Sequence, residues 1–355
     1  MTRPAVLIFH RPATVGDPEL VRFLAGVRAE LAQRQAVLFE RAGAATPRVL
    51  DEWHEGLTFG EVLASVAPAR GGAVILGSGA VPRLNPGDAR RLVSVAASGE
   101  RQAVTNNRYS SDIVALGRAA TLRDLPPLPG DNPLPRWLEE RAGFVVTELP
   151  GRERLALDLD TPLDVALAAL APGAPSWLRR AAATAKLTIP RLEELRAVVR
   201  DPTKELLIFG RSGSRTLAWL ELNVRCRVRF LSEERGLRAS SPLAIAGAAP
   251  TVARRPNSSL SLLLDQRGPA AFAEIVASLG DAALVDSRVL LAARLGADES
   301  RWPHASDRFN SDLHRSAEVR DPWLRDLTAS ASAAEMPILL GGHSLVGPGV
   351  RLLLV

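Results

Sequence analysis

Residues 5–35 read AVLIFHRPATVGDPELVRFLAGVRAELAQRQ, and this stretch decides the fold class. Its first five residues form a compact apolar run, which is typical of a buried strand. The following stretch, 10–18, contains proline and glycine and predicts a loop. Residues 19–35 then place apolar side chains at helical spacing, at Leu20, Phe23, Leu24, Val27 and Leu31. A strand, a loop and an amphipathic helix in succession indicate an α/β fold.

The same alternation continues along both halves of the chain. Further strands are predicted in the first half at 36–39, 72–76, 102–105, 113–116 and 155–159. Helices are predicted at 58–66, from Asn85 with Pro86 in the first turn, and at 161–170 with Pro162 at the start. This alternation indicates a mostly parallel sheet with helices on both faces.

In the second half, strands are predicted at 205–209, 227–231, 282–286 and 337–340, and helices at 215–222, 270–279 and 322–331. A chain of 355 residues is long for one core. We therefore expect two domains, residues 1–172 and a second α/β domain at 176–355. Residues 126–135 and 240–259 predict a proline-rich loop and a long loop or lid.

Composition limits the possible classes of protein. Hydrophobic residues make up 46% and charged residues 23%, which is ordinary for a globular protein. No apolar run is long enough for a membrane span, and the start shows no signal-peptide pattern. The single Cys226 excludes an internal disulfide and a cysteine zinc site. We therefore expect a soluble, cytoplasmic protein.

The net charge of +5 does not by itself indicate nucleic-acid binding. Many arginines stand beside acidic residues, as in 137–141, which predicts mixed and solvated helix surfaces. Aromatic residues make up 5% and are scattered, whereas nucleic-acid binders gather basic and aromatic residues on one stripe. We therefore expect neither a nucleic-acid partner nor a membrane, and the sequence does not indicate an oligomeric state.

Three segments resemble glycosyltransferase-A-like nucleotidyltransferases, in the same order along the chain. They are 7–16 (LIFHRPATVG), 59–63 with 74–84 (FGEVL and VILGSGAVPRL), and 157–164 (LDLDTPLD). The nearest groups are the phospholactate and molybdenum-cofactor guanylyltransferases and an uncharacterised bacterial family with this fold. The resemblance covers about the first half of the chain, and the second half resembles no family.

The resemblance implies a protein that handles a nucleotide or phosphorylated sugar, with its site between the domains. Backbone donors and cations surround the phosphates in such sites, and a carboxylate holds Mg²⁺ or Mn²⁺. It implies metal binding by Asp158 and Asp160. Nucleotide contacts are expected from Arg11, Gly77, Gly79, Asn106 and Arg108, with Asn107 beside them. The alternatives are that Asp160 caps the helix at Thr161, and that the other residues belong to ordinary turns and loops.

The chain departs from the family pattern at two places. Asp17, Pro18 and Glu19 stand where the family has basic residues, and Gly79 and Ala80 stand where it has its metal-binding aspartate. These changes imply reduced activity. The alternative is a non-catalytic ligand-binding or assembly protein derived from such an enzyme.

The second half offers a third hypothesis, a metal-assisted phosphate ester hydrolase. Asp286 ends a predicted strand, and His343 follows two glycines after another, so both are expected at the edge where α/β sites form. With them we consider His304, Asp307, Asp312 and His314 as metal ligands or acid/base groups. None of the spacings matches a defined metal motif, and a surface loop is the alternative. Residues 209–214 follow a strand and predict either an anion site or a simple N-cap by Ser212 or Ser214.

Overall fold

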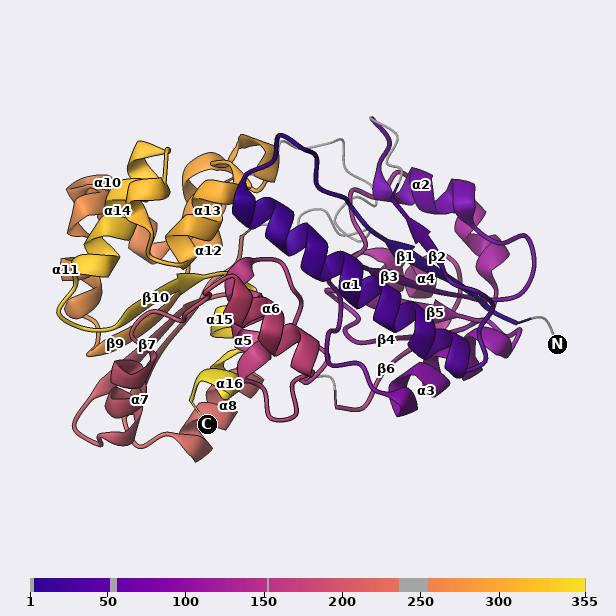
Figure 1. Ribbon diagram of the computed structural model, residues 1–355, viewed down its shortest axis with the longest axis horizontal. Coiled ribbons are helices and arrows are strands. Elements are labelled where there is room, and N and C mark those ends of the chain that lie inside the picture. Colours follow the sequence, from indigo (N-terminus) through magenta and orange to yellow (C-terminus); the bar gives the residue numbers. More distant parts are fainter. Residues whose placement is uncertain (1–2, 52–55, 152, 236–254, 355) are drawn as a thin grey trace. The chain divides into compact units, whose positions relative to one another are not determined.

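The computed structural model describes residues 3–51, 56–151, 153–235 and 255–354, and the chain divides into two compact units. The described part of the first unit comprises residues 3–17, 22–51, 56–151 and 153–160, and that of the second comprises 18–21, 161–235 and 255–354 (Figure 1). Residues 240–254 of the predicted loop or lid lie outside the described residues. The two-unit α/β fold expected from the sequence is confirmed.

The first unit contains a six-stranded sheet in its described part, in the order β2-β1-β3-β5-β4-β6. Strand β5 is antiparallel to both of its neighbours, and the other pairs are parallel. The mostly parallel sheet is therefore as predicted. The strands are β1 (Ala5–Phe9), β2 (Arg48–Leu50), β3 (Ala73–Gly77), β4 (Gln102–Thr105), β5 (Ile113–Leu116) and β6 (Val145–Glu148).

Two apolar layers cover the faces of this sheet. One contains Phe59, Leu63 and Trp137 from α2 and α4, and the other contains Phe39 and Leu92 from α1 and α3. Thr58 and Asn85 form capping boxes with Glu61 and Asp88, which fixes the starts of α2 and α3. The helices are α1 (Glu19–Arg41), α2 (Phe59–Val66), α3 (Pro86–Ala97), the 3₁₀ helix η1 (Ala119–Asp124) and α4 (Leu134–Glu140).

Two strands predicted in the first half are wrong. Residues 36–39 belong to α1, because Phe39 continues the buried helical face and is fully buried. Residues 155–159 form no strand. Their leucines 155, 157 and 159 are buried in alternation, which imitates a strand pattern.

The second unit contains a four-stranded, fully parallel sheet in its described part, in the order β10-β9-β7-β8. Its strands are β7 (Glu205–Gly210), β8 (Arg227–Ser232), β9 (Ala282–Asp286) and β10 (Ile338–Gly341). The predicted strands are confirmed to within one residue at each end, and a helix lies at each predicted helical segment. The longer helices are α5 (Pro162–Leu170), α6 (Ser176–Thr184), α7 (Leu192–Arg200), α8 (Ser214–Asn223), α10 (Ser259–Arg267), α12 (Ser287–Leu295), α13 (Ala305–Asp312) and α14 (Pro322–Ala333).

Short helical segments complete the second unit. They are α11 (Phe272–Ala277), α15 (His343–Val346), α16 (Val350–Leu353), and the 3₁₀ helices η3 (Pro269–Ala271), η4 (Glu299–Arg301) and η5 (Ser316–Glu318). None of the helices in the described ranges combines the length and the apolar character that crossing a lipid bilayer requires.

The division between the units differs from the predicted boundary. Helix α5, which the sequence assigned to the first domain, belongs to the second unit, where it packs against α6 and α16. A Cβ atom at Gly349 would lie 3.0 Å from the Leu167 side chain, which shows how closely α5 approaches the C-terminal segment. The unit boundary therefore follows Asp160 rather than residue 172.

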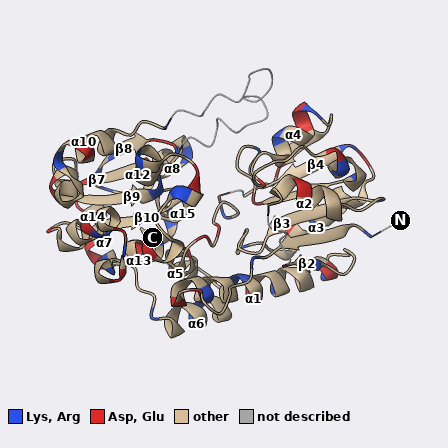
Figure 2. Ribbon diagram, turned by 90° about the horizontal axis from the view of Figure 1, so that it is seen from above, with Lys and Arg blue, Asp and Glu red and all other residues tan. Residues whose placement is uncertain are grey.

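Basic and acidic residues are interspersed along the helices of both units (Figure 2). Several of them form ion pairs one helical turn apart, such as Arg34 with Glu30 and Arg136 with Glu140. Pairs at this spacing stabilise helix surfaces modestly.

Candidate functional site

Polar side chains of the first unit meet at one edge of its sheet. His10, Ser78 and Asn106 follow directly after the parallel strands β1, β3 and β4. Asp112 precedes β5, and because β5 runs in the opposite direction its beginning lies at the same edge. The carboxyl edge of a parallel sheet is where α/β proteins usually bind ligands.

Gly79 brings two segments of the family resemblance into contact. The Leu159 amide donates to the Gly79 carbonyl oxygen at 3.0 Å. A Cβ atom at residue 79 would lie 2.8 Å from Arg28 Nε and 3.2 Å from Asp158 Oδ1. A glycine is therefore needed here to leave room for the Arg28 and Asp158 side chains. At Gly77, by contrast, a Cβ atom would meet nothing within 4 Å.

Four carboxyl groups influence one another beside this glycine. Burial, followed by the charge of Asp131, raises the pKa of Asp112 to about 8. Burial also raises the pKa of Asp131 to about 6, with Asp160 contributing. The pKa of Asp158 is raised well above its usual value, first by burial and then by Asp160 and Asp112. All three side chains keep some solvent access, although protein atoms crowd them. Such a group of carboxyl groups favours a cation nearby.

Arg28 of α1 approaches this group from one side. Its Nε donates to the Leu159 carbonyl oxygen at 2.6 Å, and its Nη2 pairs with Asp160 Oδ1 at 2.9 Å. The Asp160 side chain is 69% exposed, so solvent weakens this pair. Asp160 does not cap α5. That role belongs to Thr161, which forms a capping box with Asp164.

The donor chemistry of the cluster suits Mg²⁺ or Mn²⁺, since both prefer carboxylate oxygens. Within the described ranges, no three His, Cys, Asp or Glu side chains already surround one point as a metal site would require. A bound cation would therefore have to draw the carboxylates of Asp112, Asp131 and Asp158 closer together.

Asn106 orients Asp112. Its Nδ2 donates to Asp112 Oδ2 at 2.6 Å and to the Leu155 carbonyl oxygen at 2.9 Å, and its Oδ1 accepts from the Asp112 amide at 3.0 Å. The side chain is buried. Asn106 thus lies at the predicted site, but it holds a carboxylate in place.

The two arginines predicted to contact a nucleotide have different surroundings. The Arg108 side chain is bound to strand β6 and α4, donating to the Val146 carbonyl oxygen at 2.8 Å and pairing with Glu139 at 3.1 Å. Arg11 is exposed on the loop after β1. Asn107, which precedes Arg108 in the sequence, accepts a hydrogen bond from the Tyr109 amide at 3.0 Å. Arg108 therefore has a structural role at the end of β6.

Four residues of this edge were not predicted from the sequence, namely Asp112, Asp131, Arg28 and a buried histidine. His10 Nδ1 lies 3.0 Å from Ser78 Oγ, and burial together with Arg28 lowers the His10 pKa. Asp112, His10 and Ser78 each adjoin an apolar strand, and this position was the signal that could have identified them. Asp131 and Arg28 carry no such signal in the sequence.

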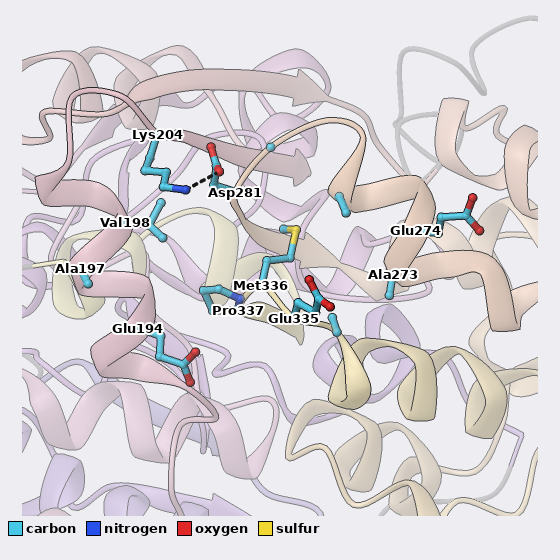
Figure 3. A pocket seen from close by; sticks show the side chains of 13 residues that line it. Glu194, Ala197, Val198, Lys204, Ala273, Glu274, Asp281, Glu335, Met336 and Pro337 are labelled. Atoms are coloured by element: carbon cyan, nitrogen blue, oxygen red, sulfur yellow. Dashed lines mark hydrogen bonds and ion pairs between the residues drawn. The ribbon is translucent and has the colours of Figure 1, made fainter.

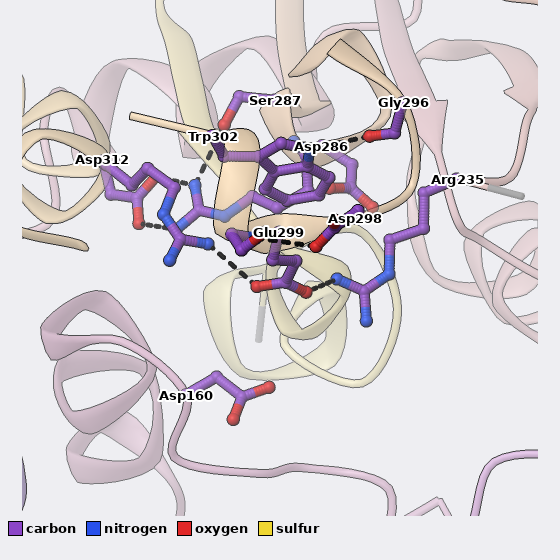
Figure 4. A network of polar contacts seen from close by, with 12 residues as sticks. Asp160, Arg235, Asp286, Ser287, Gly296, Asp298, Glu299, Trp302 and Asp312 are labelled. Carbon is purple, nitrogen blue, oxygen red and sulfur yellow. Dashed lines mark hydrogen bonds and ion pairs between the residues drawn. The ribbon is translucent and has the colours of Figure 1, made fainter. Parts of the chain in front are cut away.

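Asp286 of the second unit is fully buried and bound to arginine (Figure 4). Arg211 Nε donates to its Oδ2 at 2.6 Å, and the Arg288 amide donates to its Oδ1 at 3.2 Å. Burial alone would raise the Asp286 pKa, but Arg211, Arg288 and His343 outweigh burial and lower it. Gly210 has a φ of +118°, and a Cβ atom there would lie 2.3 Å from Asp286 Cβ.

A second buried pair joins the same network. Arg288 Nη2 donates to Asp312 Oδ2 at 2.7 Å, and both side chains are almost inaccessible to solvent. Nearby, Glu299 pairs with Arg308 at 3.1 Å and also with Arg235 (Figure 4). The carboxylates of Asp286, Asp312 and Glu299 are therefore paired with arginine side chains.

The remaining members of the predicted His/Asp group have separate roles. His304 is exposed and caps α13, accepting from the Ser306 amide at 3.2 Å, while buried Asp307 accepts from the Asp321 amide at 2.9 Å. Burial and Arg191 lower the His314 pKa to about 4. His343 Nδ1 lies 2.6 Å from the Arg211 carbonyl oxygen. These residues do not converge on a metal site among the described residues.

The predicted N-cap of α8 is also wrong. Gly213 occupies the cap position and supplies no side-chain hydrogen bond. Ser212 Oγ instead donates to the Val346 carbonyl oxygen at 2.6 Å, and Ser214 is the first helical residue.

No protein-family model matches the chain, and no curated protein sequence matches it. Two crystal structures of Rv0371c from Mycobacterium tuberculosis H37Rv are similar to 46% of the chain, at 21% sequence identity and a TM-score of 0.27. The match covers 96% of the Rv0371c chain in one of these structures. It covers 95% of the Rv0371c chain in the other, which is a complex with manganese. Similarity of this degree assigns neither a family nor a function.

Proposed function

We propose that the first unit is a nucleotidyltransferase-like domain that binds a nucleotide or phosphorylated small molecule together with a divalent cation. The observation that carries this proposal is the group formed by Asp158, which lies beside Gly79, and the carboxyl groups of Asp112, Asp131 and Asp160, whose charges act on one another and on Asp158. Carboxylates that raise one another's pKa values are common at functional sites.

The cluster compensates for the carboxylate that the sequence lacks. Gly79 and Ala80 stand where the family resemblance places the metal-binding aspartate. Asp112 reaches the same sheet edge from the beginning of the antiparallel strand β5. Asp131 contributes a further carboxyl group whose charge raises the Asp112 pKa. Oxygen donors for Mg²⁺ or Mn²⁺ are thus supplied from other points of the chain.

The surrounding groups suit a phosphorylated ligand. Gly77 leaves open space beside the backbone, which permits close approach of a phosphate or sugar. Arg28 provides a cation from α1, where the loop after β1 has Asp17 in place of a basic residue. A divalent cation, when bound, would neutralise phosphate oxygens. His10 has a lowered pKa, so its imidazole is neutral at pH 7 and shares a hydrogen bond with Ser78 at this edge.

Thermal unfolding of the full chain tests this proposal. Nucleoside triphosphates and sugar nucleotides are added with and without Mn²⁺, and a ligand at a hundred times its Kd adds about 2.7 kcal/mol of stability. We expect one ligand class to stabilise the protein only with Mn²⁺. Asp158→Asn should remove the shift, whereas Asp124→Asn, an exposed carboxylate on η1, should keep it. Absence of a shift across the panel, or a shift unchanged in Asp158→Asn, would overturn the proposal.

A second candidate is a binding protein that retains the ligand without turning it over. It is favoured by the loop after β1, which has Asp17 where a basic residue would contact a phosphate. The Asp17 carboxylate accepts a hydrogen bond from the Thr14 amide at 2.7 Å. Incubation of the stabilising triphosphate with the protein, Mn²⁺ and a panel of phosphorylated acceptors, followed by chromatography of the nucleotide, separates the two. Transfer of the nucleotidyl group to an acceptor phosphate with release of pyrophosphate indicates the enzyme, and an intact triphosphate with every acceptor indicates the binding protein.

A further inference from the structure

The second unit has a cavity of about 630 Å³ at the amino ends of β7, β9 and β10 (Figure 3). This volume falls within the usual range for small-molecule sites. Its walls come from α7, α11 and the segment before β10. Apolar side chains cover much of them, namely Ala197, Val198, Ala273, Ala277, Met336 and Pro337.

One wall of the cavity is held rigidly. Arg191 donates to the carbonyl oxygens of Ala334, Glu335 and Met336 and forms two hydrogen bonds with Glu194. Its own backbone is left-handed, with φ +49°. Three hydrogen bonds from this guanidinium fix residues 334–336 in place, and two more join it to Glu194 on α7. A wall fixed before binding lowers the entropic cost of taking up a ligand.

Acidic groups surround the apolar surface. Four carboxylates line the cavity with one ammonium group, and they come from Glu194, Glu274, Asp281, Glu335 and Lys204. Asp281 is paired with Lys204 at 3.0 Å, and Glu274 with Arg267 at 2.6 Å. Among the described residues, Glu335 forms no ion pair with any basic side chain, and Figure 3 places its carboxylate beside Met336. The cavity thus combines an aliphatic wall with a carboxylate open to a cation.

We propose that this cavity binds a small aliphatic cation, an alkylammonium or alkylguanidinium. Its hydrocarbon body lies against Val198 and Met336, and its charged head pairs with Glu335. Met336 suits this role because its unbranched side chain adapts to ligands of different shape. The lining contains no aromatic residue, so an aromatic cage for quaternary ammonium groups is not formed. This inference is independent of the function proposed for the first unit.

Saturation-transfer NMR and calorimetry on the full chain test the site with pentylammonium, pentanol and pentanoate, which share one hydrocarbon body. We expect pentylammonium to bind with a Kd on the order of 1 mM, more tightly than pentanol, and pentanoate not to bind. Glu335→Gln should weaken pentylammonium binding up to about fivefold and leave pentanol unchanged. Glu318→Gln, an exposed carboxylate elsewhere in the unit, is the matched control and should have no effect.

A second variant tests the cavity itself. Ala197→Phe adds a large side chain at an exposed position of α7, so it fills the cavity without disturbing the core. It should abolish binding of both pentylammonium and pentanol while the unfolding midpoint stays unchanged. Equal binding of all three probes, or binding that survives Ala197→Phe, would overturn the proposal, as would the absence of pentylammonium binding at 20-fold the expected Kd.

Discussion

Acidic residues lie at the carboxyl edges of both sheets, but their surroundings shift their pKa values in opposite directions. In the second unit, burial acts to raise the pKa of Asp286, but Arg211, Arg288 and His343 together outweigh it and lower this pKa. In the first unit, burial and neighbouring carboxyl groups raise the pKa of Asp112 and Asp158. A carboxylate matched by arginine is part of the protein's own structure. Carboxyl groups that face one another instead favour a cation from solution, and the comparison therefore separates a structural edge from a binding edge.

The largest expected effect comes from breaking the structural edge. Arg288→Met leaves Asp312 buried without its guanidinium partner, so the free energy of unfolding should fall by about 3–5 kcal/mol. Urea unfolding at pH 7 measures this loss. Arg267→Met removes an exposed pair with Glu274, and its effect on the free energy of unfolding should be much smaller because solvent screens this pair. Similar losses in the two variants would contradict the structural role of the second edge.

At the edge of the first sheet, we expect a substitution to raise the free energy of unfolding instead of lowering it. Because the folded-state pKa of Asp112 is about 8, the folded protein keeps a proton that the unfolded chain loses near pH 4. The contribution of Asp112 to the free energy of unfolding is therefore fully present below pH 4, and it is lost as the pH rises to about 8. Asp112→Asn removes this loss, so it should stabilise the protein by about 2 kcal/mol at pH 8 and have no effect at pH 4.

Urea unfolding at the two pH values, without added metal, tests the Asp112 prediction. Asn can still accept the hydrogen bond that Asn106 donates to residue 112, so the variant changes charge more than geometry. A variant that is less stable than the parent at pH 8 would show that Asp112 is compensated in the same way as Asp286.

The smallest effect concerns the arginine of the first edge. Arg28→Gln should change the free energy of unfolding by less than about 1 kcal/mol, because its partner Asp160 is mostly exposed. It should nevertheless raise Mn²⁺ affinity about threefold, since it removes a positive charge from beside the carboxylates. Calorimetric titration with Mn²⁺ measures this change. Weaker Mn²⁺ binding in Arg28→Gln would mean that Arg28 orders the site instead of competing for it.

Strand-helix alternation predicted most of the fold, because apolar spacing and capping residues are local properties. It failed at 155–159, where buried leucines alternate as in a strand but the segment forms no strand. It also failed at 36–39, where α1 continues. In both places, a run of buried apolar residues did not distinguish a strand from a helix or from an irregular segment.

The candidate site was less predictable. Asp158 and Asp160 came from the family resemblance, and the structure brings both beside Gly79 and Arg28. Asp112 and Asp131 were missed because the direction of β5 and the path of residues 126–135 depend on tertiary structure. In the second half, the residue types were right for a metal site, but their partners are arginines and backbone groups that no local pattern reveals.

The antiparallel placement of β5 also has a consequence for folding. Strands β4 and β5 are neighbours in the chain, so their pairing and the contact between Asn106 and Asp112 close only a short loop. Asp158 reaches the cluster through a much longer loop, from β3 to residue 159. We therefore expect the carboxyl groups to come together in a late, long-range step of folding. The rate of this step should depend on pH and on divalent cations, which links the kinetics of folding to the ligand chemistry of the finished site.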